Sequence, residues 1–375
     1  MELTKCKLGE LITQRREKND GSDLPICGVS KDGLIPPKQK DADTSIYNVF
    51  YRDDFIFNPA RMELNSIAIN DMYDRAICSS LYEVFYVHRT DLLLPHYLEL
   101  IIRQKWFTRY CKFLGQGSAR EYCRFGNISE IEIEFPPIEE QQKIVEYNTA
   151  IENRIALKQK INDNLATQAL TLFSDFVSHL SKKLEQRKLG DVIASANTGG
   201  DAIQKVPIVD YDTGIKCARV GDITNAREYA SWAFCNASKS VYDNYKLQAG
   251  DILVTRTATL GITQYIAKDI SAVYNNGLIR LKVNDTNALP LYIYWAMKTS
   301  DFLNYINQMN SATSVRPNMK IDYLLNYQLS IPSIEEQTQF TNTVEPLMNA
   351  ISLNNDEILK LSEFQAIILT TLSSR

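Results

Sequence analysis

Two stretches of the chain repeat mainly apolar side chains at alternating intervals of four and three residues, between 151 and 176 and again between 347 and 372. This spacing places the side chains along one face of an α-helix, as in the seam of a coiled coil. Because a stripe of this length cannot remain in water, the pattern predicts two long helices that pack antiparallel within the chain. The first series is Ile151, Ile155, Lys158, Asn162, Leu165, Ala169, Leu172 and Phe176, and the second is Leu347, Ile351, Asn354, Ile358, Leu361, Gln365, Ile368 and Leu372.

Polar residues occupy several positions of this seam. They are Lys158, Asn162, Asn354 and Gln365. A buried Asn in a zipper fixes the register of its helices, and these residues either do the same or lie at the edge of the seam. The sequence leaves both interpretations open.

A proline also distinguishes the second series from the first. Pro346 stands where the first copy has Ala150. Proline inside a helix removes a hydrogen bond, whereas in the first turn it is tolerated. The second helix is therefore expected in two pieces, a short one near 334–344 and a long one that starts at Pro346. Ser333 and Glu336 form a capping box for the short piece.

A short motif precedes each long helix and reveals an internal repeat. The sequence FPPIEEQ at 135–141 returns as IPSIEEQ at 331–337, and KLGELI at 7–12 returns as KLGDVI at 188–193. A repeat of this length predicts two equivalent folded units related by a pseudo-twofold axis.

Each repeat combines strands and helices. Runs at 45–51 and 81–87 are typical of strands, 95–113 of a helix, and 129–135 of a half-buried strand that ends at two prolines. The predicted fold is α+β, with two pseudo-symmetric mixed α/β domains separated by two long helices that form an antiparallel coiled coil. The expected boundaries are 1–137 and 186–333 for the domains, and 138–185 and 334–375 for the spacer helices.

Composition narrows the class of protein. Hydrophobic residues make up 45% and charged residues 23% of the chain, as in a soluble globular protein. No stretch is long and apolar enough for a membrane span, and the first residues lack the apolar core of a signal peptide, so a cytoplasmic location is expected. The seven cysteines are scattered without a C-x-x-C pair, which favours reduced, packed thiols over a zinc site.

Charge along the chain is segregated, although its net value is only −4. Six Lys and Arg residues lie between 101 and 124 beside one acid, and the following segment to 152 carries seven Glu with one Lys. Binding to phosphates depends on where the cations lie, so a basic surface next to an acidic helix is compatible with nucleic acid as a partner.

The order of these elements resembles the specificity subunit of type I restriction-modification systems, which defend bacteria against phage. The resemblance rests on the duplicated P-x-I-E-E-Q motif that closes a β-rich domain and leads into a heptad helix, and it covers nearly the whole chain. It implies two target recognition domains held apart by an antiparallel coiled coil. It also implies a non-catalytic protein that binds double-stranded DNA together with two DNA adenine methyltransferase subunits and, for cleavage, restriction and translocase subunits.

Further expectations follow from this resemblance. No cofactor is expected on the chain itself, because S-adenosylmethionine and ATP would be bound by the partner subunits. Two different recognition domains at a fixed separation would read a split, asymmetric DNA site.

Candidate DNA contacts in the first domain fall into two groups. The loop GQGSAR at 115–120 and the turn after it combine Gly with side chains that bind guanine, adenine or phosphate, and a second group follows the strand near 54–57. Structural turns are the alternative for both groups. The candidates are Gln116, Ser118, Arg120, Tyr122 and Arg124 in the first group, Asn58, Arg61 and Asn65 in the second, and the weaker Arg52.

The second domain carries matching groups at the same places in the repeat. The loop NSATSVR at 310–316 matches the first loop, and TRT at 255–257 follows the equivalent strand. The candidates are Ser314, Arg316, Asn318 and Lys320 in the loop group, Thr255, Arg256 and Thr257 at the strand end, and the weaker Arg219 and Asn276.

Two other classes of function remain to be compared with this one. A coiled-coil scaffold that binds only proteins would keep the helices but would not need matching basic loops in both domains. An enzyme acting alone is disfavoured, because the sequence lacks a P-loop, a dinucleotide-binding glycine turn and the Asn-Pro-Pro-aromatic motif of adenine methyltransferases; the sequence NPAR at 58–61 departs from that motif.

Overall fold

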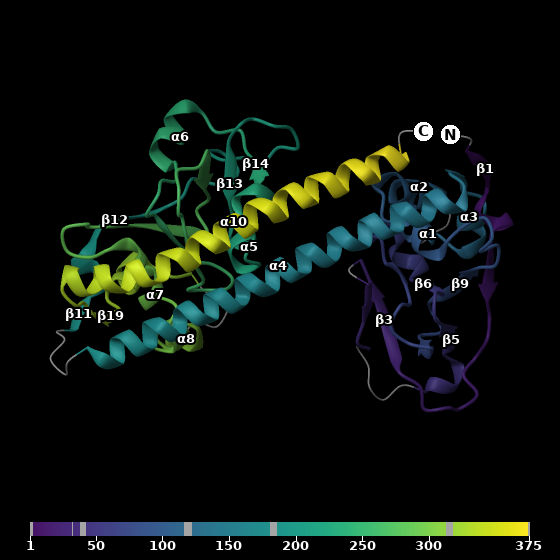
Figure 1. Ribbon diagram of the computed structural model, residues 1–375, viewed down its shortest axis with the longest axis horizontal. Helices are drawn as coiled ribbons and strands as arrows, with labels where there is room; N and C mark the ends of the chain where they lie inside the picture. Colours follow the sequence, from purple (N-terminus) through teal and green to yellow (C-terminus); the bar gives the residue numbers. More distant parts are fainter. Residues whose placement is uncertain are drawn as a thin grey trace. The chain divides into compact units, whose positions relative to one another are not determined.

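The structure is a computed structural model that describes residues 3–31, 33–37, 43–115, 122–180, 186–312 and 318–373 (Figure 1). The chain divides into two compact units. The first comprises Met1–Arg154 and Leu361–Arg375, and the second comprises Ile155–Lys360. We call the globular part of the first unit, within 3–137, the first lobe, and that of the second unit, within 186–333, the second lobe.

Three small sheets form the first lobe. β1 (Thr4–Lys7) pairs antiparallel with β10 (Glu132–Phe135), so both ends of the lobe meet. A four-stranded antiparallel sheet has the order β2 (Ile12–Arg15), β9 (Glu83–Val87), β6 (Phe55–Phe57) and β7 (Ile67–Ile69). A second one has the order β4 (Gly33–Ile35), β3 (Ile26–Ser30), β8 (Arg75–Cys78) and β5 (Asn48–Tyr51), with β3 and β8 parallel.

Short helices complete the first lobe. The expected single helix over 95–113 is instead two, because the Gln104 N–H bonds to the Ile101 carbonyl at 3.1 Å and closes a tight last turn before the second helix begins. The helices are η1 (Leu8–Glu10), η2 (Thr44–Ile46), η3 (Pro59–Leu64), α1 (Pro95–Ile102), α2 (Lys105–Gly115) and α3 (Phe125–Ser129).

The second lobe repeats this plan. β11 (Gln186–Lys188) pairs with β19 (Gln328–Ser330), and the main sheet has the order β12 (Ile193–Thr198), β18 (Leu278–Val283), β15 (Ile252–Thr255) and β16 (Thr263–Tyr265). A third sheet contains β14 (Ala233–Phe234), β13 (Lys216–Ala218) and β17 (Ala272–Tyr274), the last two parallel. Its helices are η4 (Leu189–Val192), η5 (Tyr229–Ser231), α5 (Val220–Thr224), α6 (Lys239–Tyr245), α7 (Pro290–Ala296), α8 (Ser300–Ala312) and α9 (Ile321–Leu325).

The glutamine of the repeated motif explains why that motif recurs. Gln141 and Gln337 are both fully buried (0% exposed). The Gln141 side chain accepts from the Leu94 N–H at 2.9 Å and donates to the carbonyls of Leu92 and Pro136 at 2.7 and 2.8 Å. Gln337 accepts from the Leu289 N–H at 2.7 Å and donates to the Pro332 carbonyl at 2.9 Å. Each glutamine therefore ties the start of a spacer helix to the N-terminus of α1 or α7.

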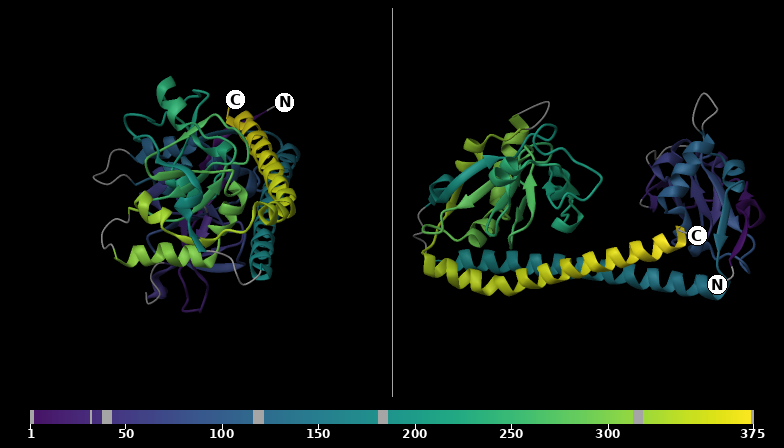
Figure 2. Two further views of the ribbon diagram at one scale, coloured as in Figure 1. Left: turned by 90° about the vertical axis from the view of Figure 1, so that its left-hand side faces the viewer. Right: turned by 90° about the horizontal axis from the view of Figure 1, so that it is seen from above.

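The two spacer helices are α4 (Ile138–His179) and α10 (Ile334–Ser373). In the second unit their segments run side by side in both views of Figure 2. Lys158 donates to Asn354 at 2.9 Å and pairs with Glu357 at 2.7 Å, while Asn162 bonds to Asn354 at 2.8 Å and Asn355 at 2.7 Å. Residues later in α4 thus contact residues earlier in α10, so the helices are antiparallel. Lys158, Asn162 and Asn354 bond to one another, whereas Gln365 donates to Asn148 at 2.9 Å and to Glu152 at 3.1 Å.

The expected break of the second helix is wrong, because α10 continues through Pro346 (Figure 1). Pro346 and Asn342, whose carbonyl loses its helical donor, are both exposed, so water can satisfy that carbonyl. On the opposite side of the helix Phe340 and Val344 are buried in the core of the second lobe and hold the helix in place. The capping box is confirmed, since Ser333 N–H donates to Glu336 at 2.9 Å and Glu336 N–H to Ser333 at 3.3 Å.

Candidate nucleic-acid interface

In each lobe one backbone hydrogen bond joins two segments that are far apart in the sequence. The Cys123 N–H donates to the Pro59 carbonyl at 3.0 Å, and the Met319 N–H donates to the Arg256 carbonyl at 2.8 Å. Cys123 and Met319 occupy equivalent positions of the repeat, and the acceptors lie within two residues of the ends of the equivalent strands β6 and β15. The described candidates of the two groups inferred from the sequence are therefore adjacent in both lobes.

Four of the first-lobe candidates lie around the Cys123–Pro59 bond. Asn58 precedes η3, and its side-chain oxygen accepts from the Ala60 N–H at 3.1 Å. Arg61 is exposed, and together with Asn58 it lines a cavity of about 620 Å³. Arg124 lies over the ring of Tyr122 at 5.5 Å and is 3.4 Å from Glu83, with most of its side chain exposed. An amide, an aromatic ring and two guanidinium groups thus share one edge of the lobe.

Asn65 has a local role instead. It ends η3 in a left-handed conformation, with φ of 53°, which Asn tolerates better than most residues. Its N–H bonds to the Met62 carbonyl at 3.0 Å, and its side-chain oxygen is buried without a hydrogen-bond partner among the described residues. Asn65 therefore shapes the turn that carries Arg61.

Arg256 connects three segments of the second lobe. Its guanidinium donates to the Met319 carbonyl at 3.2 Å, to the Asn276 carbonyl at 3.2 Å and to the Asn318 side chain at 2.7 Å. Thr257 also forms a β-bridge with Asn318. A guanidinium has more N–H donors than these three bonds use, so Arg256 can both hold the segments together and donate to a ligand. Lys320, exposed at the start of α9, lies next to the same bridge.

The position of Thr255 does not fit a direct contact with DNA. Its side chain is fully buried (0% exposed), and its hydroxyl accepts from the Ile262 N–H at 2.9 Å. The Thr255 N–H bonds to the Ile262 carbonyl at the same distance, so the residue closes the loop that leaves β15. A polar residue at a strand end is equally typical of a turn and of a binding site, and here burial decides for the turn.

A glycine that the sequence did not single out brings Arg219 near this cluster. A Cβ atom on Gly277 would lie 2.5 Å from the Val220 side chain and 3.0 Å from the Thr257 hydroxyl, so the close approach of these segments requires glycine. Arg219, beside Val220, pairs with the buried Asp222 at 3.0 Å, and this carboxylate raises the pKa of Arg219. Asn276 is exposed and precedes Gly277.

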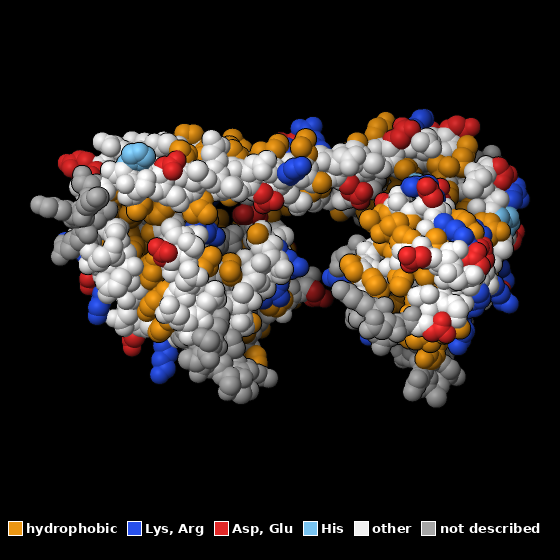
Figure 3. All heavy atoms as spheres, turned by 90° about the horizontal axis from the view of Figure 1, so that it is seen from below, with side chains coloured by type: hydrophobic (Ala, Val, Ile, Leu, Met, Phe, Trp, Pro, Cys, Tyr) orange, Lys and Arg blue, Asp and Glu red, His pale blue; other side chains and the backbone are white. Residues whose placement is uncertain are grey.

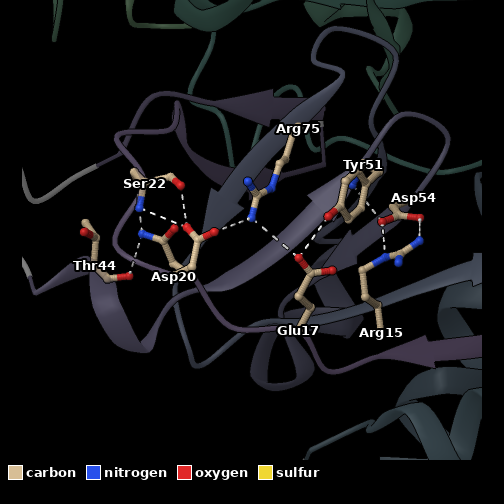
Figure 4. A network of polar contacts seen from close by, with 9 residues as sticks. Arg15, Glu17, Asp20, Ser22, Thr44, Tyr51, Asp54 and Arg75 are labelled. Carbon is tan, nitrogen blue, oxygen red and sulfur yellow. Dashed lines mark hydrogen bonds and ion pairs between the residues drawn. The ribbon is translucent and has the colours of Figure 1, made fainter.

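Arg52 lies at the other end of β6 from Asn58. It bonds to Asp74 at 2.9 Å and to the Asp71 carbonyl at 2.6 Å. The turn that contains Arg52 is fixed by Asp54, which pairs with Arg15 at 2.6 Å and accepts from the Tyr51 N–H at 2.8 Å. The Tyr51 hydroxyl extends these polar contacts to Glu17, which pairs with Arg75, and Arg75 also pairs with Asp20 (Figure 4). The structure therefore does not bring Arg52 to the cluster around Cys123.

The remaining candidates lie outside the described residues. They are Gln116, Ser118, Arg120, Ser314 and Arg316. The segments that follow these loops are described, and the hydrogen bonds of Cys123 and Met319 anchor them. On the face drawn in Figure 3, Lys and Arg side chains are spread in small groups among acidic ones, in line with the low net charge.

Comparison with known proteins gives consistent results. The model of the "Type I restriction modification DNA specificity domain" matches residues 9–167 and again 181–363. The specificity subunit of the type I restriction enzyme MjaIX from Methanocaldococcus jannaschii is 23% identical over 313 residues, which are 75% of this chain and 69% of that protein. No helix in the described part of this chain has the length and apolar character needed to cross a membrane.

Two solved structures match the chain at low sequence identity, and the first of them shares its fold. The crystal structure of the type I restriction-modification S subunit from M. genitalium matches with a TM-score of 0.55 at 14% identity, covering 99% of this chain and 96% of that one. The HsdS subunit from Thermoanaerobacter tengcongensis matches over 99% of this chain and 96% of its own, at 18% identity and a TM-score of 0.41.

Proposed function

The chain belongs to the family of type I restriction-modification DNA specificity proteins, and from this premise we propose that its two lobes each read one part of a split DNA site. As a member of this family it is a non-catalytic subunit that supplies DNA sequence specificity. The observation that carries the proposal is the equivalent backbone bond, Cys123 to Pro59 and Met319 to Arg256, which gathers exposed polar side chains at the same place in both lobes.

The two clusters differ in chemistry, and this supports an asymmetric target. The first presents Asn58, Arg61 and Arg124 beside an aromatic ring, and the second presents Arg256 with Asn276 and Asn318. Arg pairs with guanine and Asn with adenine in the major groove, so different arrangements of these side chains read different bases. The spacer helices would then fix the distance between the two parts of the site, and the base pairs between these two parts would not be read.

Exposed apolar residues on the spacer helices support docking of partner subunits. Leu157 and Leu353 of the second unit are exposed by 59% and 69%, and neither belongs to the seam. In the first unit Tyr147, Phe364 and Ile367 are also exposed. Apolar groups of this kind on a helix surface are typical of protein interfaces. We propose that they bind two DNA adenine methyltransferase subunits, which carry S-adenosylmethionine, in the cytoplasm; ATP belongs to a translocase subunit where one is present.

Mapping of methylated adenines in a genome tests this function. The chain is expressed with its methyltransferase subunit in a host without adenine methylation, and sequencing should reveal one motif with two specified parts and an unspecified gap. Arg61→Ala should relax bases in one part only. Asn276 bonds to the described residues through its backbone, so Asn276→Ala should relax bases in the other part only. Each variant should weaken binding to the cognate duplex roughly 10- to 100-fold.

The matched control is Lys239→Ala, an exposed cation on α6 outside both clusters. It should leave the motif and the affinity unchanged. The proposal fails if no split motif is methylated, if Arg61→Ala and Asn276→Ala alter the same part, or if Lys239→Ala has an equal effect.

A further inference from the structure

A cavity of about 410 Å³ lies between the second lobe and α10, within the second unit. The lobe contributes the segment around η5 and residues 264–271, and the helix contributes a face that includes Met348, Ile351 and Asp356. None of these residues belongs to the clusters described above. The volume lies in the range of sites that hold small molecules.

Aromatic and aliphatic side chains form much of its wall. Trp232 and Ile266 are buried, and the Tyr229 ring packs edge-on against Trp232 at 5.9 Å. Tyr265 lines the cavity as well, with Tyr294 packed behind it at 5.5 Å. Such rings attract a cation through the negative charge at their faces, and they also bury the apolar part of a ligand.

Negative charge exceeds positive charge on the lining. Three carboxylates, of Glu228, Asp269 and Asp356, face one amine, of Lys268. Lys268 pairs with Asp356 at 3.3 Å, and Asp269 accepts from the Ala249 N–H at 2.9 Å. The Glu228 carboxylate has neither an ion pair nor a hydrogen bond among the described residues. Acidic side chains are visible where the long helices meet the left-hand lobe of Figure 3.

The state of Glu228 is consistent with a missing counter-ion. Although its side chain remains accessible to water, the surrounding protein raises its pKa, and the Asp356 carboxylate raises this pKa further. Gln264, also on the lining, has its side-chain oxygen buried without a hydrogen-bond partner in the described structure. The cavity therefore offers more acceptors than donors.

Neighbouring cations are already engaged. Lys216 lies 5.1 Å from the Tyr229 ring and donates to the Ala230 carbonyl. Lys298 lies 5.0 Å from the Tyr294 ring and donates to the Thr263 carbonyl at 2.8 Å. Neither is an ion-pair partner of Glu228 in the described structure, so the carboxylate is available to a ligand.

We propose that this cavity binds a small organic cation, an alkylammonium or alkylguanidinium with an apolar body, with Glu228 as its counter-ion and Trp232 and Tyr265 as the wall for its aliphatic part. A metal ion fits less well, because hard cations need several oxygen ligands and the described residues contain no group of three or more metal-ligating side chains. Since the lining comes from both the lobe and α10, the ligand would stabilise their contact.

Calorimetric titration of the full chain with agmatine and with spermidine tests the proposal. Saturable binding of at least one amine in a 1:1 ratio is expected, together with a rise in the thermal midpoint of the second unit. The uncharged 1,4-butanediol should not bind. Glu228→Gln should weaken amine binding roughly tenfold or more, because the ligand loses the lining carboxylate that bonds to no other described residue.

The matched control is Glu335→Gln, which removes an exposed carboxylate in the first turn of α10. It should leave the affinity unchanged, which separates a built site from general attraction of cations to an acidic protein. The proposal is overturned if neither amine binds saturably, if butanediol binds as well as the amines do, or if the two Glu→Gln variants lose the same affinity. Because the Glu228 carboxylate bonds to none of the described residues, its substitution should not unfold the lobe, and circular dichroism can verify this.

Discussion

The first and second lobes build their main sheets in the same order but differ in the segment just after the central strand β6 or β15. In the first lobe this segment offers Pro59, an exposed Arg61 and Asn58, whose side-chain oxygen accepts from the Ala60 N–H, whereas in the second Arg256 binds three segments with its side chain. The backbone bond is the same in both. The lobes thus keep the position of the cluster constant while its side chains vary, which is what two readers of different sequences require.

A buried carboxylate also occupies the same place in both lobes, while the cations near it differ. Asp54 and Asp251 are both buried, and each accepts from an N–H three residues earlier, at 2.8 and 2.9 Å. Burial raises the pKa of both carboxyls. The opposing cation comes from Arg15 on β2 in the first lobe, but from Arg280 and Lys282 on β18 in the second. Equivalent carboxylates are therefore neutralised from different strands.

The largest effect should come from removing the glutamine that both lobes share. Gln141→Met leaves three backbone groups without partners, one of them buried and two partly buried, whereas Gln337→Met leaves one buried and one partly buried. A buried orphaned group costs about 1–3 kcal/mol, and a partly buried one lies near the lower end because water can reach it, so the free energy of unfolding should fall by roughly 3–5 kcal/mol for Gln141→Met and roughly 2–4 kcal/mol for Gln337→Met. Hydrogen exchange of the peptides at 92–98 and 287–293 would report each lobe separately.

Gln142→Met is the matched control, because Gln142 is the exposed neighbour of Gln141 and its side chain, among the described residues, bonds to Glu146. Its effect should stay within about 0.5 kcal/mol. Equal losses for Gln141→Met and Gln142→Met would show that the buried hydrogen bonds do not hold α1 to α4. If Gln141→Met increased hydrogen exchange in the second-lobe peptides as much as in the first-lobe peptides, the two glutamines would not act as separate ties, each within its own lobe.

Sequence patterns predicted the parts of this molecule that depend on periodicity and repetition. None of the heptad positions described in both helices is exposed, although Phe173 is more deeply buried than its neighbour Leu172, and the repeated motif marks equivalent helix starts. Sequence patterns could not predict that Thr255 points inward, because its burial depends on a hydrogen bond to Ile262 across a loop. They also could not predict that Arg256 connects three segments, because its partner Met319 is distant in the sequence. The break near Gln104 was missed for a related reason, since no Gly or Pro marks it.

The two lobes also differ in the cation near the C-terminal ends of α1 and α7. Arg103 in the first lobe bonds to Glu99 at 3.3 Å and to the Lys31 carbonyl at 2.8 Å. Lys298 stands at the equivalent place in the second lobe, where burial lowers its pKa to about 8. The folded protein then releases a proton that the unfolded chain retains, so the free energy of unfolding should rise with pH, by about 2 kcal/mol between pH 7.5 and 9.5.

Urea unfolding of the second unit at several pH values measures this slope. Lys298→Met should remove it, because the group that titrates is gone, and Arg103→Met should leave it unchanged. If the free energy of unfolding of Lys298→Met rose with pH as steeply as that of the unchanged protein, the pH dependence would come from other groups. Lys298 and Arg103 would then not differ in their effect on this pH dependence.

The smallest effect is expected where the two spacer helices differ. Pro346→Ala gives α10 the residue that α4 has at Ala150 and restores a hydrogen bond to the exposed carbonyl of Asn342. Water already satisfies that carbonyl, and alanine makes the unfolded chain more flexible, so the gain should be only about 1 kcal/mol, well below the full cost of a proline in a helix interior. Ala150→Pro, the reverse change in α4, should instead lower the free energy of unfolding by roughly 3 kcal/mol. Asn148 and Ile151 beside it are buried, and α4 is not adapted to the loss of a backbone hydrogen bond at this position. Thermal unfolding of both variants decides the matter: if they shift the midpoint by equal and opposite amounts, α10 is not adapted to its proline, and the two helices are interchangeable at this position.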